Sequence, residues 1–178
     1  MSRFVRLILI AAAMTVFLIG MIVDHNVRRT TGTEILLDLE PVDPRDLLAG
    51  YYVIISTPLH SIDPEQVGGE ADFERSADVY VVVEPDGGGS WQPVSIHSER
   101  PEAGVFVHGK VQWVSPNTIR AHFNLERYYA DADTAQALEI RRQAGPDSLR
   151  LIVSVGSDGR AIIRGLEIDG ERVMDSLR

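Results

Sequence analysis

The side chains best suited to chemistry in this sequence are two close pairs of carboxylates. Asp43 and Asp46 lie three residues apart, and Asp38 and Glu40 lie two residues apart. Such pairs can act as general acid and base, or can bind a hard cation. Each pair also has a structural explanation. Asp43 can cap a helical turn, and Asp46 would lie in the first turn of that helix, where the helix dipole favours a carboxylate. Asp38 and Glu40 fit the solvated face of a strand. The structural explanation is the stronger one, so we predict no catalytic residue here.

Five histidines raise the question of a metal site. His108 and His122 fall on the same face of two predicted adjacent strands, close to cross-strand register. A zinc site needs at least a third ligand at fixed geometry, and only Glu126 or Asp46 suggests itself. Two solvent-facing histidines on a half-exposed sheet explain the pair without a metal. We therefore predict no metal and no cofactor. The other three histidines follow no recognisable pattern.

Nucleophilic catalysis has less support still. The chain has no cysteine, which excludes disulfides, thiolate nucleophiles and thiolate metal sites. It has no Gly-x-Ser-x-Gly sequence, and its single lysine, Lys110, has no serine at a recognisable spacing. The glycine run 87–89 lacks the helix and lysine of a phosphate-binding loop and fits the tip of a hairpin. We predict that the protein is not an enzyme, and a hydrolase is the least supported alternative.

The rest of the chain is organised around residues 36–57, LLDLEPVDPRDLLAGYYVIIST. Apolar and acidic residues alternate up to Pro41, as in a half-buried strand. A short helical turn beginning at Pro44 would end at Gly50, where a left-handed residue is needed. Residues 52–55 then form a β-prone run. This stretch predicts a strand, a tight turn and a second strand.

The same stretch resembles the signature of the bacterial GDYXXLXY family, small membrane-anchored proteins without an established biochemical role. The resemblance lies in residues 41–48 (PVDPRDLL) and 50–55 (GYYVII). Tyr51 stands in place of the signature's Asp, Ile55 in place of its Leu, and Thr57 in place of its final Tyr. The resemblance implies family membership and transfers no activity.

A second block supports the resemblance. Residues 125–129 (LERYY), followed by Glu139, are similar to the family's Glu-Arg-Tyr-Phe segment, and the turns at 158–160 and 169–171 fit its C-terminal hairpin. The candidate binding residues that follow from both blocks are Asp43, Arg45, Asp46, Gly50, Tyr52, Glu126, Arg127, Tyr128 and Glu139. They form either a docking or ligand patch, or an internal polar network that pins a helix to the sheet, because buried polar groups need partners.

The charge balance argues against nucleic-acid binding. The chain has 17 basic and 26 acidic residues, a formal net charge of −9. All acidic residues lie after Val23, so without Arg3 and Arg6 the remainder carries 15 basic residues against 26 acidic ones. Such a surface repels the phosphates of nucleic acids and anionic lipid headgroups.

The N-terminal segment predicts a membrane anchor. Residues 7–23 carry no charge, and counting from Phe4 gives about 20 residues, about 30 Å of helix, which is enough to cross the hydrocarbon core. A cleaved signal peptide has a shorter apolar core and a small-residue cleavage site, which the sequence at 21–24 (MIVD) lacks. Arg28 and Arg29 on the far side nearly balance Arg3, Arg6 and the free amine, but the nearer charges and the short N-terminus favour an N-terminus in the cytoplasm. The anchor would then leave the rest of the chain facing the periplasm or outside of the inner (cytoplasmic) membrane.

Beyond the anchor the chain is dominated by hairpins. Predicted hairpins join 78–84 to 91–97, 104–114 to 118–126, and 149–155 to 161–168. The alternation along the second hairpin places Val105, Val107, Val111 and Trp113 on one face. One helix is expected over 131–145, and 58–77 reads as a loop with no core residues.

The predicted fold is mainly β (α+β), an antiparallel sheet or small sandwich built of hairpins with one short helix, preceded by one transmembrane helix. We divide it into a signal anchor (1–23), a juxtamembrane linker (24–33) and an extracytoplasmic domain (34–178). The leading functional hypothesis is an interaction or accessory module that partners another membrane protein. The alternative is a sensor that binds a small-molecule ligand between the signature turn and the segment Glu126–Tyr129.

Overall fold

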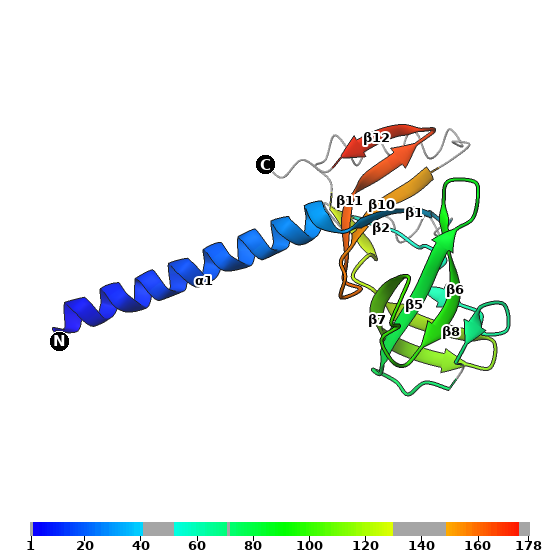
Figure 1. Ribbon diagram of the computed structural model, residues 1–178, viewed down its shortest axis with the longest axis horizontal. Helices are drawn as coiled ribbons and strands as arrows, with labels where there is room; N and C mark the ends of the chain where they lie inside the picture. The colour runs from blue at the N-terminus through cyan, green and yellow to red at the C-terminus, as the bar shows by residue number, and fades with distance from the viewer. Residues whose placement is uncertain (1, 41–51, 71, 130–148, 175–178) are drawn as a thin grey trace.

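A long helix, α1 (Arg3–Thr31), projects from a strand-rich domain (Figure 1). The computed structural model describes residues 2–40, 52–70, 72–129 and 149–174. The hydroxyl of Ser2 caps the helix by accepting the Val5 N–H at 3.3 Å. The membrane-length span runs from Arg3 to Val27; its most apolar 18-residue window has a mean hydropathy of 2.5, and none of that window is buried. The helix is therefore long and apolar enough to cross a membrane, in agreement with the sequence.

Residues 24–33, which the sequence predicts to form a polar linker, differ from that expectation. The helix continues through Thr31, and strand β1 (Thr33–Asp38) begins only two residues later. The hydroxyls of Thr30 and Thr31 donate to the carbonyls of Asn26 and Val27 at 2.9 and 2.8 Å, and so provide partners near the helix end. Only Gly32 separates the helix from the sheet.

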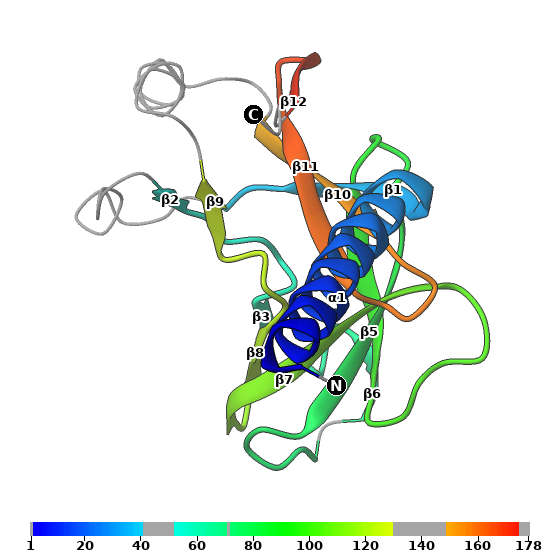
Figure 2. The same cartoon turned by 90° about the vertical axis from the view of Figure 1, so that its left-hand side faces the viewer.

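The described part of the domain contains three sheets. A four-stranded antiparallel sheet has the order β1-β10-β11-β12, with β10 (Leu149–Val155), β11 (Ala161–Ile168) and β12 (Glu171–Met174). A two-stranded sheet pairs β2 (Tyr52–Ile54) with β9 (Arg127–Tyr129). A six-stranded sheet has the order β3 (Ser61–Ile62), β8 (Thr118–His122), β7 (Val105–Ser115), β5 (Asp78–Pro85), β6 (Trp91–His97) and β4 (Gly68–Gly69). Figure 2 looks onto the side from which α1 projects and shows the four-stranded sheet above, the six-stranded sheet below and the β2–β9 pair beside them.

The C-terminal hairpins agree with the sequence. β10 pairs with β11 across the turn at 156–160, and β12 follows the tight turn at Asp169 and Gly170, which both have positive φ. β1 adds to the other edge of β10, with Ile35 opposite Val153 and Leu37 opposite Leu151. All four of these side chains are fully buried. The expected alternation in the first strand is confirmed.

Ion pairs cross the opposite face of the four-stranded sheet. Arg150 on β10 lies 3.3 Å from both Asp38 and Glu167. Arg172 on β12 extends this chain of contacts to Glu34 on β1, at 2.9 Å. These charges join strands that are far apart in the sequence, and they stabilise the face that does not meet the core.

The six-stranded sheet is built on the two hairpins expected from the sequence. β5 (Asp78–Pro85) pairs with β6 (Trp91–His97), and β7 (Val105–Ser115) pairs with β8 (Thr118–His122). The Asp86 carboxylate accepts the N–H groups of Gly88 and Ser90 at 2.7 and 3.1 Å and closes the first hairpin. The glycine run is thus a hairpin tip.

The predicted placement of Trp113 on the same face as Val111 is wrong. The register of β7 against β8 shifts between Val111 and Trp113, which marks a bulge at Gln112. The extra residue turns Trp113 to the other face, where it is 37% exposed, whereas Val111 stays buried. Phe106, which strict alternation places on the face opposite Val105 and Val107, is buried because the β10–β11 turn packs onto it at Gly159. A period-2 pattern misses both effects, since one depends on a bulge and the other on a distant turn.

The segment 58–77, predicted as a loop with no core residues, contributes to the core. Two short strands lie within it, β3 (Ser61–Ile62) beside β8 and β4 (Gly68–Gly69) parallel to β6. Leu59, Ile62, Val67 and Phe73 are buried. Their irregular spacing follows no strand or helix period, and this is why the sequence hides them.

One hydrophobic cluster unites the sheets. It includes Ile35 of β1, Val81 of β5, Ile119 of β8 and Val153 of β10, all fully buried. The strand-rich fold with one N-terminal membrane-length helix is therefore confirmed. The expected turn at 43–50 and the expected helix at 131–145 lie outside the described residues.

Candidate functional site

The short sheet of β2 (Tyr52–Ile54) and β9 (Arg127–Tyr129) joins the two sequence blocks that carry the candidate binding residues. The antiparallel register places Tyr52 opposite Tyr129 and Ile54 opposite Arg127. Just beyond it, the Ile55 N–H donates to the Glu126 carbonyl at 3.0 Å. The backbones of the signature and of the second block are therefore neighbours, although more than 70 residues separate them in sequence.

The candidate residues differ in their surroundings. Tyr128 is 4% exposed and belongs to the core, whereas Arg127 on the other side of β9 is exposed. Tyr52 is described only through its backbone pairing. Five further candidates lie outside the described residues, namely Asp43, Arg45, Asp46, Gly50 and Glu139. A binding role for the set stays a prediction.

His60, which the sequence analysis left without a role, lies beneath this junction. Its side chain is buried, with only 4% of the residue exposed. The Thr57 N–H donates to its Nδ1 at 3.0 Å, so the neutral ring carries its proton on Nε2. That Nε2 atom points toward the Glu126 Oε1 atom at 3.6 Å and has no closer polar partner within the described chain. The contact is longer than a hydrogen bond, but it aligns a buried N–H with a carboxylate.

Glu126 receives donors from three directions. Its Oε1 atom accepts the Phe123 N–H at 2.8 Å and lies 3.2 Å from the His122 Nδ1 atom, in addition to the contact with His60. Burial alone would raise the pKa of this carboxyl. The combined contacts from His60, the backbone and His122 outweigh burial and lower the pKa from 4.5 to about 2. Glu126 is therefore a permanent anion that holds the loop between β8 and β9.

Thr57, His60 and Glu126 share the connectivity of a hydroxyl–imidazole–carboxylate triad. The Thr57 Oγ1 atom lies 3.0 Å from the His60 Nδ1 atom, and the Nε2 atom faces the carboxylate. Two features argue against nucleophilic catalysis at this place. Thr57 is fully buried, so its hydroxyl faces no substrate, and the His60 Nδ1 lone pair already accepts the Thr57 N–H. The arrangement is best explained as a structural contact between buried polar groups. We call the contacts of His60 with Thr57 and Glu126 the polar brace.

The pattern of the GDYXXLXY family matches residues 14–166 of this chain. The match runs from the middle of α1 to β11 and so takes in both blocks and the two strands, β2 and β9, by which they pair. The chain belongs to the GDYXXLXY family. Comparisons with curated proteins and with solved structures found no match.

The family signature ends inside the buried brace. Thr57 stands where the GDYXXLXY pattern has its final tyrosine, and its backbone and hydroxyl both contact His60. Glu126, which begins the second family block, meets the same histidine from the other side. The two blocks of the GDYXXLXY chain are thus connected through His60 as well as through the β2–β9 pairing. Sequence reasoning missed His60 because a single histidine in a loop-like segment carries no periodic signal.

The predicted histidine pair is adjacent but does not converge. Lys110 is the residue opposite His122, so His108 lies one step further along the same face. His108 contacts Asp78 at 2.7 Å and stacks on Tyr80 with ring centroids 4.6 Å apart, whereas His122 contacts Glu126. Lys110 also contacts Asp78, at 2.9 Å, and these two partners lower the pKa of that carboxyl. Within the described ranges, no three histidine or carboxylate side chains are grouped to hold a metal ion.

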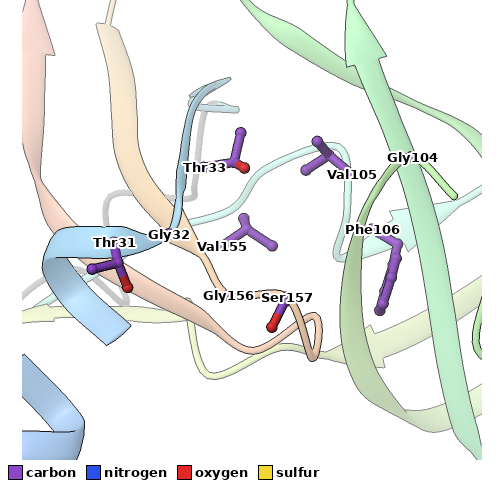
Figure 3. A pocket seen from close by; sticks show the side chains of 9 residues that line it. All are labelled: Thr31, Gly32, Thr33, Gly104, Val105, Phe106, Val155, Gly156 and Ser157. Carbon is purple, nitrogen blue, oxygen red and sulfur yellow. The ribbon is translucent and has the colours of Figure 1, made fainter. Parts of the chain in front are cut away.

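A pocket of about 180 Å³ lies where α1 joins the domain (Figure 3). Three segments form it: the end of α1 and start of β1 (31–33), the start of β7 (104–106), and the end of β10 with the turn after it (155–157). Figure 3 shows Val105 and Phe106 across the gap from Thr33 and Val155, with the Ser157 hydroxyl at one side. This pocket is separate from the β2–β9 junction where the sequence places a possible ligand.

Proposed function

We propose that this GDYXXLXY-family chain is a single-pass membrane protein whose strand-rich domain lies outside the cytoplasm and acts as an interaction module for another membrane protein. The observation that carries the proposal is the continuity of α1 with the domain. Its apolar side chains are exposed over the whole membrane-length segment, and Gly32 alone separates the helix from β1.

Exposed apolar helix surface is stable only when lipid or another apolar helix covers it. A helix that passes into a sheet through one residue fixes the position of the domain relative to the membrane more tightly than a flexible linker would. Both features support a domain presented at a defined height above the lipid surface. Such confinement raises the effective concentration of any partner in the same membrane.

The orientation can be tested because the chain contains no cysteine. Arg3 and Arg6 precede the apolar segment and favour a cytoplasmic N-terminus. A Ser98→Cys variant places a single thiol at an exposed position of the domain. We expect a membrane-impermeant maleimide to label it from the outside of intact cells. Labelling that requires permeabilised cells would contradict the proposed orientation.

The surface proposed for docking surrounds the β2–β9 pair. Arg127 is exposed on β9, and the pairing of β9 with β2 places it beside the strand that continues the family signature. Arg45 belongs to that signature by sequence. Arginine is well suited to protein interfaces because its planar group makes several directed hydrogen bonds.

The docking test is crosslinking in native membranes followed by purification of the full chain. We compare the unmodified protein, an Arg45→Ala/Arg127→Ala double variant, and an Arg75→Ala/Arg120→Ala control that removes the same charge from exposed positions elsewhere. We expect one stoichiometric membrane-protein partner that the control retains and the Arg45/Arg127 variant loses, while all three unfold at the same temperature. Equal capture by both variants, or no partner at all, would contradict docking at this surface.

A ligand sensor is the second candidate. It is favoured by the pairing of β2 with β9, which brings the two family blocks together as a ligand site between them requires. Screening the full chain in detergent for small molecules that raise its unfolding temperature tests this candidate. A hit whose effect is lost in the Arg45→Ala/Arg127→Ala variant would support it.

A further inference from the structure

The pocket at the base of the domain has a defined depth relative to the membrane. Its first lining residue, Thr31, follows Val27, where the membrane-length span ends, by one helical turn, about 6 Å, and follows Val23, the last residue of the uncharged run, by about 12 Å. The headgroup layers extend about 5–7 Å beyond the hydrocarbon core on each side. The 25-residue span is also longer than the core requires, so the helix can tilt and bring the domain closer to the lipid. The pocket therefore lies near the outer edge of the headgroup layer, within reach of lipid headgroups.

The rim of the pocket carries a cation. The Arg100 guanidinium donates to the Ser157 carbonyl at 2.9 Å and lies 5.6 Å from the centre of the Phe106 ring. Both partners line the pocket. Among the described residues no carboxylate pairs with Arg100, and a guanidinium has five N–H donors, so donors remain for an anion. The hydroxyls of Thr33 and Ser157 likewise have no partner in the described part of the chain, and they can add hydrogen bonds.

The opposite wall has the reverse polarity. The last turn of α1, which ends at Thr31, places the negative end of the helix dipole beside the pocket. Val105 and Val155 supply apolar surface. A ligand with a phosphate, a nearby ammonium group and an apolar portion is complementary to all of these features.

We propose that this pocket binds the headgroup of a zwitterionic phospholipid, with its phosphate at Arg100 and its ammonium group toward the C-terminal end of α1. This inference rests on the proposed membrane-spanning role of α1. It explains why an acidic domain, which repels anionic lipid, can still lie close to a membrane surface. The bound lipid would fix the rotation of the domain about the helix, since the pocket is formed by both.

The test is native mass spectrometry of the full chain in detergent with added phosphatidylethanolamine. Arg100→Ala removes the cation, and Ser157→Phe fills the pocket from an exposed position while keeping the charge. Arg75→Ala is the matched control, because Arg75 also donates to a backbone carbonyl, that of Gln112 at 3.0 Å, but away from the pocket. We expect both pocket variants to weaken lipid binding about tenfold or more, and the control to bind as the unmodified chain does.

Equal lipid binding by all four proteins would overturn the proposal, because the lipid would then only coat α1. Phosphatidylglycerol bound more tightly than phosphatidylethanolamine would overturn the zwitterionic assignment. Inorganic phosphate that occupies the pocket without lipid would show a free anion to be the ligand. Alkaline extraction of membranes distinguishes a failure of the membrane-spanning role from a failure of the headgroup site. Release of the unmodified chain contradicts the membrane-spanning role. Retention of the chain together with unchanged lipid binding by the variants contradicts the headgroup site alone.

Discussion

The buried Nε2 atom of His60 faces the Glu126 Oε1 atom at 3.6 Å, and this contact connects the end of the family signature with the start of its second block. In the sequence, two hairpins (β5–β6 and β7–β8) and the short strands β3 and β4 lie between these residues. The contact orients a charged carboxylate that also holds the loop before β9. The strands β2 and β9 are therefore followed and preceded, respectively, by residues of one buried polar contact, Thr57 with His60 and Glu126.

Removing the charge of Glu126 should destabilise the domain in a pH-dependent way. The pKa of this carboxyl is about 2 in the folded chain and 4.5 ordinarily, so the unfolded chain binds the proton more readily between these values. The stabilisation is complete above about pH 4.5 and is lost as the pH falls toward 2. The side chain is 27% exposed, so we expect Glu126→Gln to cost about 2 kcal/mol at pH 7.

Thermal unfolding in detergent at pH 7 and pH 3, followed by circular dichroism, measures both effects. The unmodified chain should lose more stability than Glu126→Gln on acidification, because only the unmodified chain has this carboxylate to protonate. Parallel losses in the two proteins would contradict the assigned role. Asp158→Asn, which changes a carboxylate in an exposed turn, provides the control.

The joint between helix and sheet should not tolerate a side chain at Gly32. A Cβ atom there would collide with the Ser154 Oγ atom and lie 2.8 Å from the Val155 carbonyl oxygen. A Cβ atom added at Gly20, within α1, would meet no atom within 4 Å. We expect Gly32→Ala to lower the free energy of unfolding by about 1–2 kcal/mol and Gly20→Ala to leave it nearly unchanged. Equal unfolding midpoints of the two variants in detergent would argue against close contact at the joint.

The β10–β11 turn allows packing to be separated from backbone strain. Gly159 and Gly87 have nearly the same φ, +80° and +83°, which costs any other residue about 1 kcal/mol. A Cβ at Gly159 would also lie 2.6 Å from the Phe106 ring, whereas at Gly87 it would meet nothing within 4 Å. Gly159→Ala should therefore be the more destabilising by about 1–3 kcal/mol in chemical denaturation. Similar losses in both variants would show that strain alone matters.

The bulge in β7 predicts opposite responses at two neighbouring positions. Val111 is 2% exposed and Trp113 is 37% exposed. Val111→Thr buries a hydroxyl in the core and should cost about 2 kcal/mol, whereas Trp113→Tyr keeps an aromatic ring on the partly exposed face and should cost less than about 1 kcal/mol. Thermal unfolding of the two variants measures this difference. A large loss at Trp113 would restore the unbroken alternation that the sequence alone suggests.

Sequence alone predicted the elements whose causes are local. The uncharged run that forms most of α1, the three hairpins and the turn at 169–170 each depend on residues within a few positions of one another. Alternating side chains and turn glycines specify such units directly. The family signature was equally visible, since it is a property of consecutive residues.

The tertiary structure decided what depends on distant parts of the chain. The pairing of β1 with β10 joins residues such as Asp38 and Arg150, 112 positions apart, and the pairing of β2 with β9 is similarly remote. The burial of His60, the outward turn of Trp113 and the pocket beside Thr31 all follow from such pairings. Alternating apolar residues indicate that one face of a strand is buried. They do not indicate which strand or segment packs against it, because many pairings bury the same apolar area. Only the packed chain selects among them, and this selection creates the brace beneath Glu126 and the pocket at the base of the domain.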